Sequence, residues 1–481
     1  MNVVVVSNRV ARLNSSEAIA GGLAAALLPA VKGYGAIWVG SSGRVRQTGQ
    51  RDAFAEIESF GKGALATVDL PAEHYCGYYE GFANAGLWPT FHSRPDLIRA
   101  TSDDYRSYRE VNAYMARGLL RFCRPDATYW VQDYHFLTLG LELRQLGVEQ
   151  PIGFFLHTPW PVPSLMSAMP HHREIVQAML AFDLLGFQTQ DDQQNFADYL
   201  KEELGLPVID DVVMSVHGPC RLATFPIGID VEEFARRATK AAAGPEIARL
   251  RSSLQGAKLA IGVDRVDYSK GLINRIRAFE QMLCQQPGLR GQVSLLQIAV
   301  PSRTSIPSYC QLQNELSQLV GEVNGRHGEV DWTPVRYINK GFAQATLAGF
   351  YRAAHVGLVT PFRDGMNLVA KEYVAAQNPF DPGVLVLSRY AGAAKELDAA
   401  LLVNPHDVDD VARKLASALT MSCDERRERW EAMMEKLRAT SVHLWFSRFV
   451  KSLAATRRLS ERRPATPVLS PQPPERTIKT H

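Results

Sequence analysis

The stretch HVGLVTPFRDGMNLVAKEYVAA (residues 355–376) reads as a buried strand, a polar turn and a helix. The turn carries Arg363, Asp364 and Asn367, and the otherwise apolar start of the helix carries Glu372. A plain connection needs only a turn residue and a helix cap. The additional charged side chains indicate a binding site where the strand ends.

Short apolar runs like the one in this stretch recur along the chain and alternate with helical stretches. Near-continuous apolar strands are typical of parallel sheets that helices cover on both faces. Two successive sets of five such runs predict an α/β protein with two doubly wound domains. The runs are VVVV (3–6), AIWVG (36–40), TYWVQ (128–132), IGFFLH (152–157), LLGFQT (184–189), KLAIGV (258–263), SLLQIAV (294–300), VRYIN (335–339), HVGLVT (355–360) and GVLVLS (383–388).

The two sets of runs meet at FPIGIDVEEF (225–234), where a Pro-Ile-Gly turn separates them. We therefore expect a first domain over residues 1–228 and a second over 229–440. A C-terminal helix, 441–460, has an apolar stripe and is expected to pack back on the first domain. The segment 461–481 is Pro-rich, polar and basic, which predicts a disordered tail.

The composition of the 481 residues, with 46% apolar and 21% charged side chains, is that of an ordinary soluble globular protein. From Arg457 to the end, six Lys or Arg and two Glu give a charge of +4, which leaves about −1 of the net +3 for the rest of the chain, and no basic stripe with interleaved aromatic residues is present. A nucleic-acid or membrane partner is therefore not expected. Met1 leads directly into a strand-like run with no signal-peptide pattern, so we expect a cytoplasmic protein.

The six cysteines include no C-x-x-C pair. This spacing predicts reduced, mostly buried thiols and argues against a disulfide framework or a zinc site. The Asp-x-Asp triplet Asp407–Asp409 reads as a helix cap followed by the first helical turn. We therefore expect no metal ligands in this chain.

Parallel α/β sheets bind ligands beyond the carboxyl ends of their strands, so polar residues at those ends are candidates for a site. Gly21 and Gly22 precede a helical run after the first strand, where paired glycines let backbone amides approach a phosphate. A packing requirement would select the same pair. In DRVDYSKG (264–271), Arg265 and Lys270 are suited to clamp a pyrophosphate. The alternative is an ion-pair cluster with the two aspartates of that turn.

Other strand ends carry isolated polar residues. They are Asp133, His135, His157 and Arg303. Each alone is more often structural, but together they indicate one crevice. The dinucleotide fingerprint G-x-G-x-x-G and the Walker phosphate loop are both absent, which argues against a nicotinamide-dependent dehydrogenase.

A set of motifs distributed along the chain closely resembles the trehalose-6-phosphate synthases. In order, they are VVVVSNRV, AGGLA, NAGLWPTFH, VQDYHF, IGFFLHTPWP, GVDRVDYSKGL, VDWTPVRYIN and VGLVTPFRDGMNLVAKEYVAAQ. The resemblance implies a retaining GT-B glycosyltransferase, with two Rossmann-like domains and the active site in the cleft between them. The implied reaction moves glucose from UDP-glucose to glucose 6-phosphate in trehalose biosynthesis, without a metal or other cofactor. A homo-oligomer, dimer or tetramer, is also implied.

The resemblance assigns donor and acceptor contacts by position. The donor set is Gly21, Gly22, Arg265, Lys270, Phe342, Asp364, Asn367, Leu368, Val369 and Glu372. The acceptor set is Arg9, Tyr79, Trp88, Asp133 and Arg303. The implied catalytic residues are His157, Arg265, Lys270 and Asp364. The residue chemistry agrees, because two arginines suit a phosphomonoester and a carboxylate suits sugar hydroxyls.

No pair of carboxylates is recognisable on either side of a glycosidic bond, the arrangement that a glycoside hydrolase needs. Retention of configuration is therefore expected to proceed by a front-face transfer. In this reaction Arg265 and Lys270 stabilise the leaving diphosphate, whose oxygen helps to take the acceptor's proton. The two cations would take the place of a metal ion.

Three alternatives stay open at the sequence level. The family usually has Gly-Trp-Ser-Gly where this chain has Ser41 after Gly40, so another acceptor, such as glycerol 3-phosphate, or a pseudo-sugar product is a second interpretation. A non-catalytic regulatory homologue is a third. The sequence also does not distinguish uridine from guanosine or adenosine donors.

Overall fold

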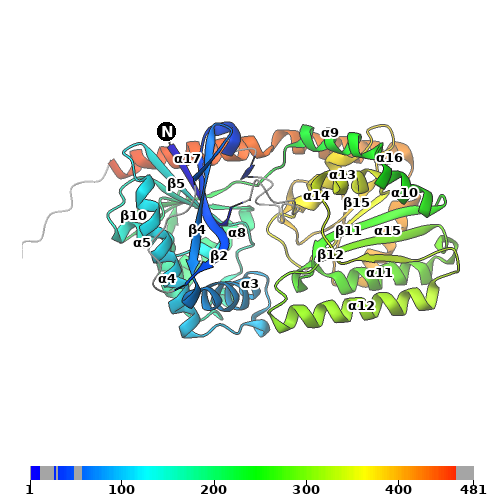
Figure 1. Cartoon of the computed structure of the whole chain (residues 1–481), viewed down its shortest axis with the longest axis horizontal. Coiled ribbons are helices and arrows are strands. Elements are labelled where there is room, and N and C mark those ends of the chain that lie inside the picture. The colour runs from blue at the N-terminus through cyan, green and yellow to red at the C-terminus, as the bar shows by residue number, and fades with distance from the viewer. Residues whose placement is uncertain (1, 11–26, 29–30, 48–56, 462–481) are drawn as a thin grey trace, which may run out of the picture.

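The computed structural model describes residues 2–10, 27–28, 31–47 and 57–461, and side chains as far as Thr456. Two α/β units lie side by side, and each has a central sheet with helices on both faces (Figure 1). The predicted architecture of two doubly wound parallel-sheet units is confirmed. The residue limits of the domains stay predictions, as does the tail, which beyond Glu461 lies outside the described residues.

The first unit holds a ten-stranded sheet in the order β3-β4-β2-β1-β5-β6-β7-β10-β9-β8. The strands from β4 to β10 in this order are parallel, and β3, β9 and β8 add antiparallel edges. The bounds are β1 Asn2–Arg9, β2 Ile37–Arg46, β3 Ile57–Phe60, β4 Gly63–Pro71, β5 Ala127–Gln132, β6 Ile152–Phe155, β7 Leu184–Phe187, β8 Val208–Ile209, β9 Val212–Ser215 and β10 Gly218–Thr224.

The second unit holds a six-stranded, fully parallel sheet in the order β13-β12-β11-β14-β15-β16. Its bounds are β11 Lys258–Arg265, β12 Val293–Val300, β13 Val335–Ile338, β14 Val356–Val359, β15 Val384–Ser388 and β16 Leu401–Val403. All ten predicted runs form strands of the two sheets. The prediction of five strands per sheet is wrong, because short or partly exposed strands extend both sheets.

Helices connect these strands, and those labelled η are short 3₁₀ turns except η1, which is a π-helix of 12 residues. In the first unit they are α2 Ala72–Tyr75, η1 Cys76–Leu87, α3 Trp88–Phe91, η2 Pro95–Leu97, α4 Ser102–Leu119, η3 Leu120–Phe122, η4 Tyr134–Phe136, α5 Leu139–Gln145, α6 Pro163–Met166, α7 His172–Met179 and α8 Gln190–Leu204. In the second they are α9 Val231–Ala242, α10 Pro245–Leu254, η5 Tyr268–Lys270, α11 Leu272–Gln285, η6 Pro287–Leu289, α12 Pro307–His327, α13 Gln344–Ala353, α14 Leu368–Ala376, η7 Gly392–Lys395, α15 Val408–Thr420 and α16 Cys423–Ala439.

Strand β1 shows why its sequence is apolar without alternation. Val3 and Val5 join one hydrophobic cluster, and Val4 and Val6 join another. Successive side chains of a strand point to opposite faces, so a sheet covered on both faces buries all four valines.

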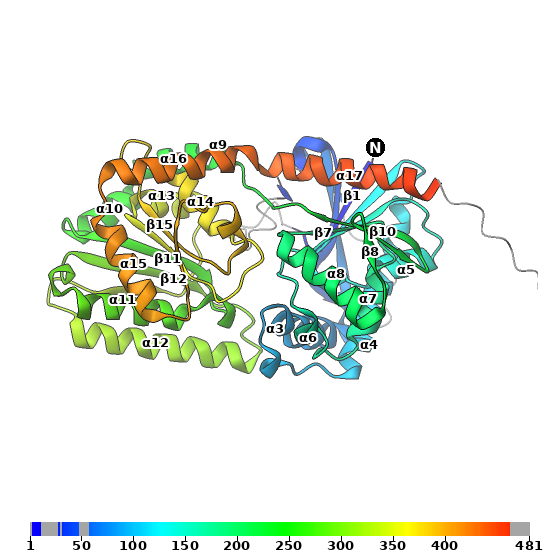
Figure 2. The ribbon, with the colours of Figure 1, turned by 180° about the vertical axis from the view of Figure 1, so that it is seen from behind.

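The last helix, α17 (Val442–Glu461), leaves the second unit and runs along the first (Figures 1 and 2). Its side chains Trp445, Phe446 and Phe449 contact the ring of Trp130 in β5, with centroid distances of 4.7, 5.0 and 4.4 Å. The helix and the segment between β10 and α9 therefore join the two units at two places.

Three smaller sequence predictions can be compared with the fold. The Asp407 side chain caps α15 by accepting a hydrogen bond from the amide of Asp410, as predicted. The prediction of mostly buried thiols is wrong, because only Cys220 is buried and four cysteines are exposed on helices or turns. Among the described residues, no helix has the length and apolar character needed to cross a bilayer.

Candidate functional site

The turn between β11 and α11 directs Lys270 toward the end of β14. Asp267 shapes this turn, since its Oδ1 accepts a hydrogen bond from the Ser269 amide at 3.0 Å. Gly271 follows with a φ of +65°, and a Cβ there would lie 2.4 Å from the carbonyl oxygen of Thr360. The Lys270 ammonium then pairs with the Asp364 carboxylate at 2.5 Å. Two neighbouring strand ends therefore place a buried cation and a carboxylate together.

The alternative of an ion-pair cluster with Asp264 and Asp267 is correct only in part. Arg265 and Lys270 help to lower the pKa of Asp267, but the ion pairs are those of Lys270 with Asp364 and of Arg303 with Asp267. Asp264 pairs with Arg275 of α11 at 2.5 Å, and Arg275 is buried. Sequence reasoning missed Arg275, although an arginine within the apolar stripe of a helix signals a buried partner. Asp264 therefore pairs with Arg275, and Lys270 pairs with Asp364.

Asn367 begins helix α14 and also contacts the ion pair. Its φ is +72°, its Oδ1 accepts from the amide of Ala370, and its Nδ2 donates to Asp364 Oδ2 at 3.0 Å. The Asn367 side chain therefore caps α14. The amides of Leu368 and Val369 lie in the first turn, where a helix attracts anions.

Glu372 lies one turn into α14 and is half-buried. Burial raises the pKa of its carboxyl to about 7, and a hydrogen bond with Gln344 opposes this shift. Phe342 packs edge-on against Phe350 with a centroid distance of 5.2 Å.

The two units touch closely at Gly365. A Cβ at this position would lie 1.9 Å from the carbonyl oxygen of His157. The backbone of Gly365 in the second unit therefore packs directly against the backbone of the first unit. Beside it, Arg363 donates to the Trp160 carbonyl oxygen at 3.1 Å. Buried Lys371 pairs with Glu396 and donates to a carbonyl of the connecting segment.

Gly365→Ala is expected to lower the free energy of unfolding by about 1–3 kcal/mol, because the added methyl group must push the backbone away from His157. Thermal unfolding would measure the change. Gly321→Ala is the matched control, since nothing lies within 4 Å of the Cβ it adds to α12. Equal stability of the two variants would contradict the prediction.

His157 follows β6 and is held neutral. Burial lowers the pKa of its ring to about 3. The ring nitrogens lie 2.9 Å from Gln132 Oε1 and 3.4 Å from Gln188 Nε2. Its amide donates to Asp133 Oδ1 at 3.3 Å. His157 and Asp133 therefore lie together, just beyond the ends of the neighbouring strands β6 and β5.

Asp133 has a φ of +70° and lies at the end of β5. Burial raises the pKa of its carboxyl to about 6, although hydrogen bonds from the backbone amides of Tyr134 and His157 oppose the shift. The group is therefore mostly ionised at neutral pH.

Arg303 follows β12 with a φ of +50°, and its side chain is 6% exposed. The guanidinium donates to Tyr309 Oη at 2.5 Å and to Tyr134 Oη of the first unit at 2.9 Å. Its carbon lies 4.0 Å from the ring centroid of Trp88. Burial lowers the pKa of Arg303, but the two tyrosines and Asp267 raise it by more. Arg303 is therefore a permanent cation between the units.

Asp267 connects Arg303 to the turn that carries Lys270. It is fully buried, accepts from Trp88 Nε1 at 3.4 Å and lies 3.5 Å from Arg303 Nη1. Burial alone would raise the pKa of Asp267, but Arg303, Arg265 and Lys270 hold it below its usual value. Exposed Arg265 lies 5.5 Å from the Trp88 ring. The candidate donor and acceptor cations thus share one carboxylate.

Arg9 and Tyr79 form the other side of this region. Arg9 ends β1 in an exposed position, lies 3.5 Å from Tyr75 Oη and 6.0 Å from the Tyr79 ring centroid. Tyr79 stacks on Tyr75 and on His135. The candidates Gly21 and Gly22 lie outside the described residues.

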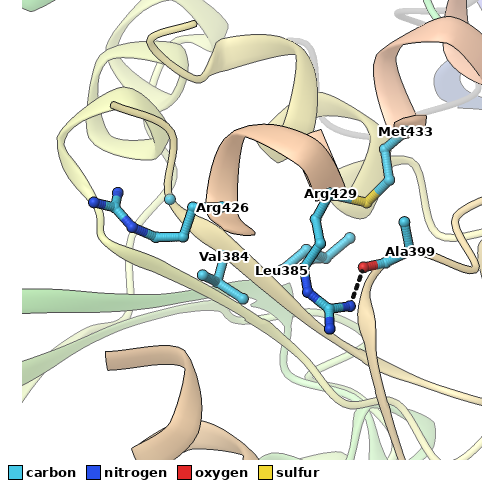
Figure 3. A pocket seen from close by; sticks show the side chains of 7 residues that line it. Val384, Leu385, Ala399, Arg426, Arg429 and Met433 are labelled. Carbon is cyan, nitrogen blue, oxygen red and sulfur yellow. Dashed lines mark hydrogen bonds between the residues drawn. The ribbon is translucent and has the colours of Figure 1, made fainter. Parts of the chain in front are cut away.

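A small hollow elsewhere in the second unit is not a candidate (Figure 3). It lies between β15 and α16, and its arginines already donate to carbonyl oxygens, Arg429 to Ala399 at 3.0 Å and Arg426 to Pro382. Within the described ranges, no group of three or more His, Cys, Asp or Glu side chains is arranged to hold a metal ion.

Comparisons with known proteins give a consistent result. The chain matches the family model of glycosyltransferase family 20 over residues 3–455. It is 44% identical over 457 residues to a trehalose-6-phosphate synthase from Sinorhizobium fredii, covering 94% of this chain and 98% of that protein. It is 42% identical to one from Klebsiella pneumoniae, covering 94% of each.

Two solved structures are also similar. An α,α-trehalose-phosphate synthase (UDP-forming) from Burkholderia xenovorans, in complex with glucose-6-phosphate, superposes with a TM-score of 0.92 at 44% identity, covering 94% of this chain and 100% of that one. An E. coli protein bound with UDP-2-fluoro glucose superposes with a TM-score of 0.88 at 40% identity, covering 94% and 99%.

Proposed function

Because the chain belongs to glycosyltransferase family 20, we propose that it is an enzyme that transfers glucose from UDP-glucose to glucose 6-phosphate, releasing α,α-trehalose 6-phosphate and UDP. One observation carries this proposal: buried Asp267 lies beside Arg303 and shapes the turn of Lys270, so cations for two phosphate groups lie close together between the units. The ligands of the two solved relatives are of these two chemical classes.

The donor binds to the second unit. Arg265 and Lys270 hold the diphosphate, together with the amides of Leu368 and Val369 at the N-terminus of α14. Asp364, fixed by Lys270 and Asn367, accepts hydrogen bonds from glucosyl hydroxyls. Glu372 binds the ribose hydroxyls and Phe342 lies beside the base. Gly21 and Gly22, outside the described residues, are proposed donor contacts from the family resemblance alone.

The acceptor binds between the units. Arg9 and Arg303 hold its phosphate, because guanidinium groups pair with phosphate oxygens through two parallel hydrogen bonds. Asp133 accepts hydrogen bonds from the sugar, and Tyr79 and Trp88 pack against it. His157, neutral and fixed by two glutamines, lies beside the transferred sugar.

The chemistry is a front-face transfer that retains the anomeric configuration. Arg265 and Lys270 stabilise the charge that develops on the departing diphosphate, and a diphosphate oxygen takes the acceptor's proton. We expect no metal requirement, because these side chains supply the positive charge. We also expect the protein to be cytoplasmic and to form a homo-oligomer, a dimer or a tetramer. Light scattering would measure the oligomeric state.

A coupled assay of UDP release tests the function. Release is expected only when UDP-glucose and glucose 6-phosphate are both present, and it should persist in a metal chelator. Ser41 pairs with Arg9 in the sheet, so the acceptor side is the place to vary the substrate. Turnover with glycerol 3-phosphate and none with glucose 6-phosphate would overturn the proposed acceptor. No turnover with any donor and acceptor would favour a regulatory protein.

Glu372→Gln is expected to weaken UDP-glucose binding about tenfold or more, because an amide cannot accept hydrogen bonds from two ribose hydroxyls as a carboxylate does. Titration calorimetry would measure the affinity. An unchanged donor affinity would refute the role of Glu372.

The same variant has an expected effect on stability that depends on pH. The pKa of Glu372 is raised to about 7 in the folded protein. Its carboxyl therefore favours folding below the unfolded pKa, and this contribution is lost as the pH rises through 7. Glu372→Gln stays neutral, so it should unfold at a higher temperature than the unmodified protein at pH 8 and lose this advantage at pH 5. Equal melting temperatures at pH 8 would contradict the burial of the charge.

A further inference from the structure

His135 lies in η4, two residues after Asp133, and the proposed reaction gives it no role. The side chain is buried, with 8% of the residue exposed. Its ring stacks on Tyr79 with a centroid distance of 5.8 Å and an interplanar angle of 13°, and it lies 4.1 Å from the ring of Tyr134. The imidazole therefore lies against a residue of the acceptor set.

Neither nitrogen of this imidazole has a hydrogen-bond partner among the described residues. The other two histidines between the units differ, since His92 Nδ1 lies 2.8 Å from the Trp88 carbonyl oxygen and His157 contacts two glutamines. A buried polar atom without a partner is unfavourable and rare in folded proteins. Such an atom calls for a ligand that supplies the missing partner.

The charges around His135 identify the ligand. Arg9 from β1 and Arg303 from the segment before α12 are the charged side chains that act on it, while Tyr78 and Tyr79 from η1 and Tyr134 from η4 pack their rings beside it. Burial and then these two cations lower the pKa of His135 to about 3, so the ring is neutral and carries one N–H.

The Arg303 guanidinium adds a second unused donor, because its buried Nε also finds no acceptor in the described part of the chain. Two cations and two unused N–H donors in one place suit an anion with several oxygens, and they repel a cation.

We propose that His135 is a ligand of the acceptor's phosphate, to which its ring donates a hydrogen bond between Arg9 and Arg303. The proposal rests on the proposed function, in which these arginines hold that phosphate. A phosphomonoester has three terminal oxygens, which is enough to accept hydrogen bonds from both guanidinium groups and the imidazole.

His135→Phe tests the proposal, because phenylalanine keeps a ring for Tyr79 to stack on but has no N–H. The KM for glucose 6-phosphate should rise about tenfold or more, the loss of one hydrogen bond to a charged group. The KM for UDP-glucose should change less than twofold, since the donor lies elsewhere. The melting temperature without substrate should not fall, because two unpaired polar atoms are removed.

Two further variants serve as controls. His135→Gln keeps an N–H donor and should recover part of the affinity for glucose 6-phosphate. His172→Phe replaces a histidine of α7 whose Nδ1 lies 2.6 Å from Tyr199 Oη. It should lower the melting temperature and leave both KM values unchanged.

The outcomes separate this inference from the proposed function. An unchanged KM for glucose 6-phosphate in His135→Phe, equal rises of both KM values, or a lower melting temperature with no preference for one substrate would overturn the role of His135. If the unmodified protein does not turn over glucose 6-phosphate, the proposed function fails. Stabilisation by inorganic phosphate then decides the inference: a thermal shift lost in His135→Phe supports it, and an equal shift in both proteins overturns it.

Discussion

Lys270→Ala is expected to lower kcat by about 100-fold or more, with initial rates of UDP release measured at saturating substrates. The Lys270 ammonium is 11% exposed and pairs with Asp364 at 2.5 Å, so it lies in a position shielded from water. There it stabilises the charge that develops on the leaving diphosphate. Its removal also takes away the charged partner of Asp364, which then keeps only the hydrogen bond from Asn367.

Lys436→Ala is the matched control for this variant. Lys436 also pairs with an aspartate, Asp398, at 2.5 Å, but the two side chains are 43% and 64% exposed. An exposed ion pair contributes little, so kcat should stay within about twofold. A comparable loss in both variants would mean that the effect of Lys270 is structural. An unchanged kcat in Lys270→Ala would exclude it from catalysis.

The sequence predicts the strands that are buried on both faces. Such strands need apolar residues at every position, as Val3 to Val6 show. This pattern can be recognised without knowing which strands lie next to each other in the sheet. The edge strands are different. Ile57–Phe60 is mostly exposed, and Leu401–Val403 spans only three residues, so neither has a run long enough to stand out from a loop. Strands β4 and β10 lie inside the first sheet but are only partly buried, so they too lack the continuous apolar run that reveals the other strands.

The candidate site is likewise predicted only in part by the sequence. Strand-end reasoning finds the turns of Lys270 and Asp364, because parallel strands bring their carboxyl ends to one edge. It does not show which charges pair across the turns. Asp267 looks like one more member of a local cluster, but its partners Trp88 and Arg303 are far away in sequence. Contacts between the two units depend on how the units pack, which no local pattern encodes.

Gly365 and Arg363 illustrate the same limit at the opening stretch of the sequence. Both lie in a turn that predicts a binding site, yet their contacts are to the backbone of His157 and Trp160 in the first unit. This turn therefore serves two purposes: Asp364 and Asn367 lie at the site, and their neighbours hold the units together. The sequence assigns Asp364 and Asn367 to the donor, but it does not show that Arg363 and Gly365 contact the other unit.

Arg303→Ala is expected to raise the KM for glucose 6-phosphate by about 100-fold or more and to change the KM for UDP-glucose much less. The guanidinium is held by Tyr309, Tyr134 and the face of Trp88, so its fork is oriented before the phosphate arrives. Two hydrogen bonds to a charged group contribute about 3 kcal/mol or more, and each 1.4 kcal/mol changes affinity tenfold. Steady-state kinetics with one substrate varied at a time would measure both constants.

Arg303→Ala changes two things at once, because Arg303 contacts the phosphate and also neutralises Asp267. Arg303→Lys keeps the charge near Asp267 but lacks the planar fork, so the KM for glucose 6-phosphate should still rise at least about tenfold, with kcat retained. Arg326→Ala removes an exposed arginine of α12 that pairs with Glu280, and it should change neither constant. Equal loss of affinity for both substrates in Arg303→Lys would count against an acceptor role. Such a result would mean that the substitution disturbs the turn shaped by Asp267, which carries the donor residue Lys270.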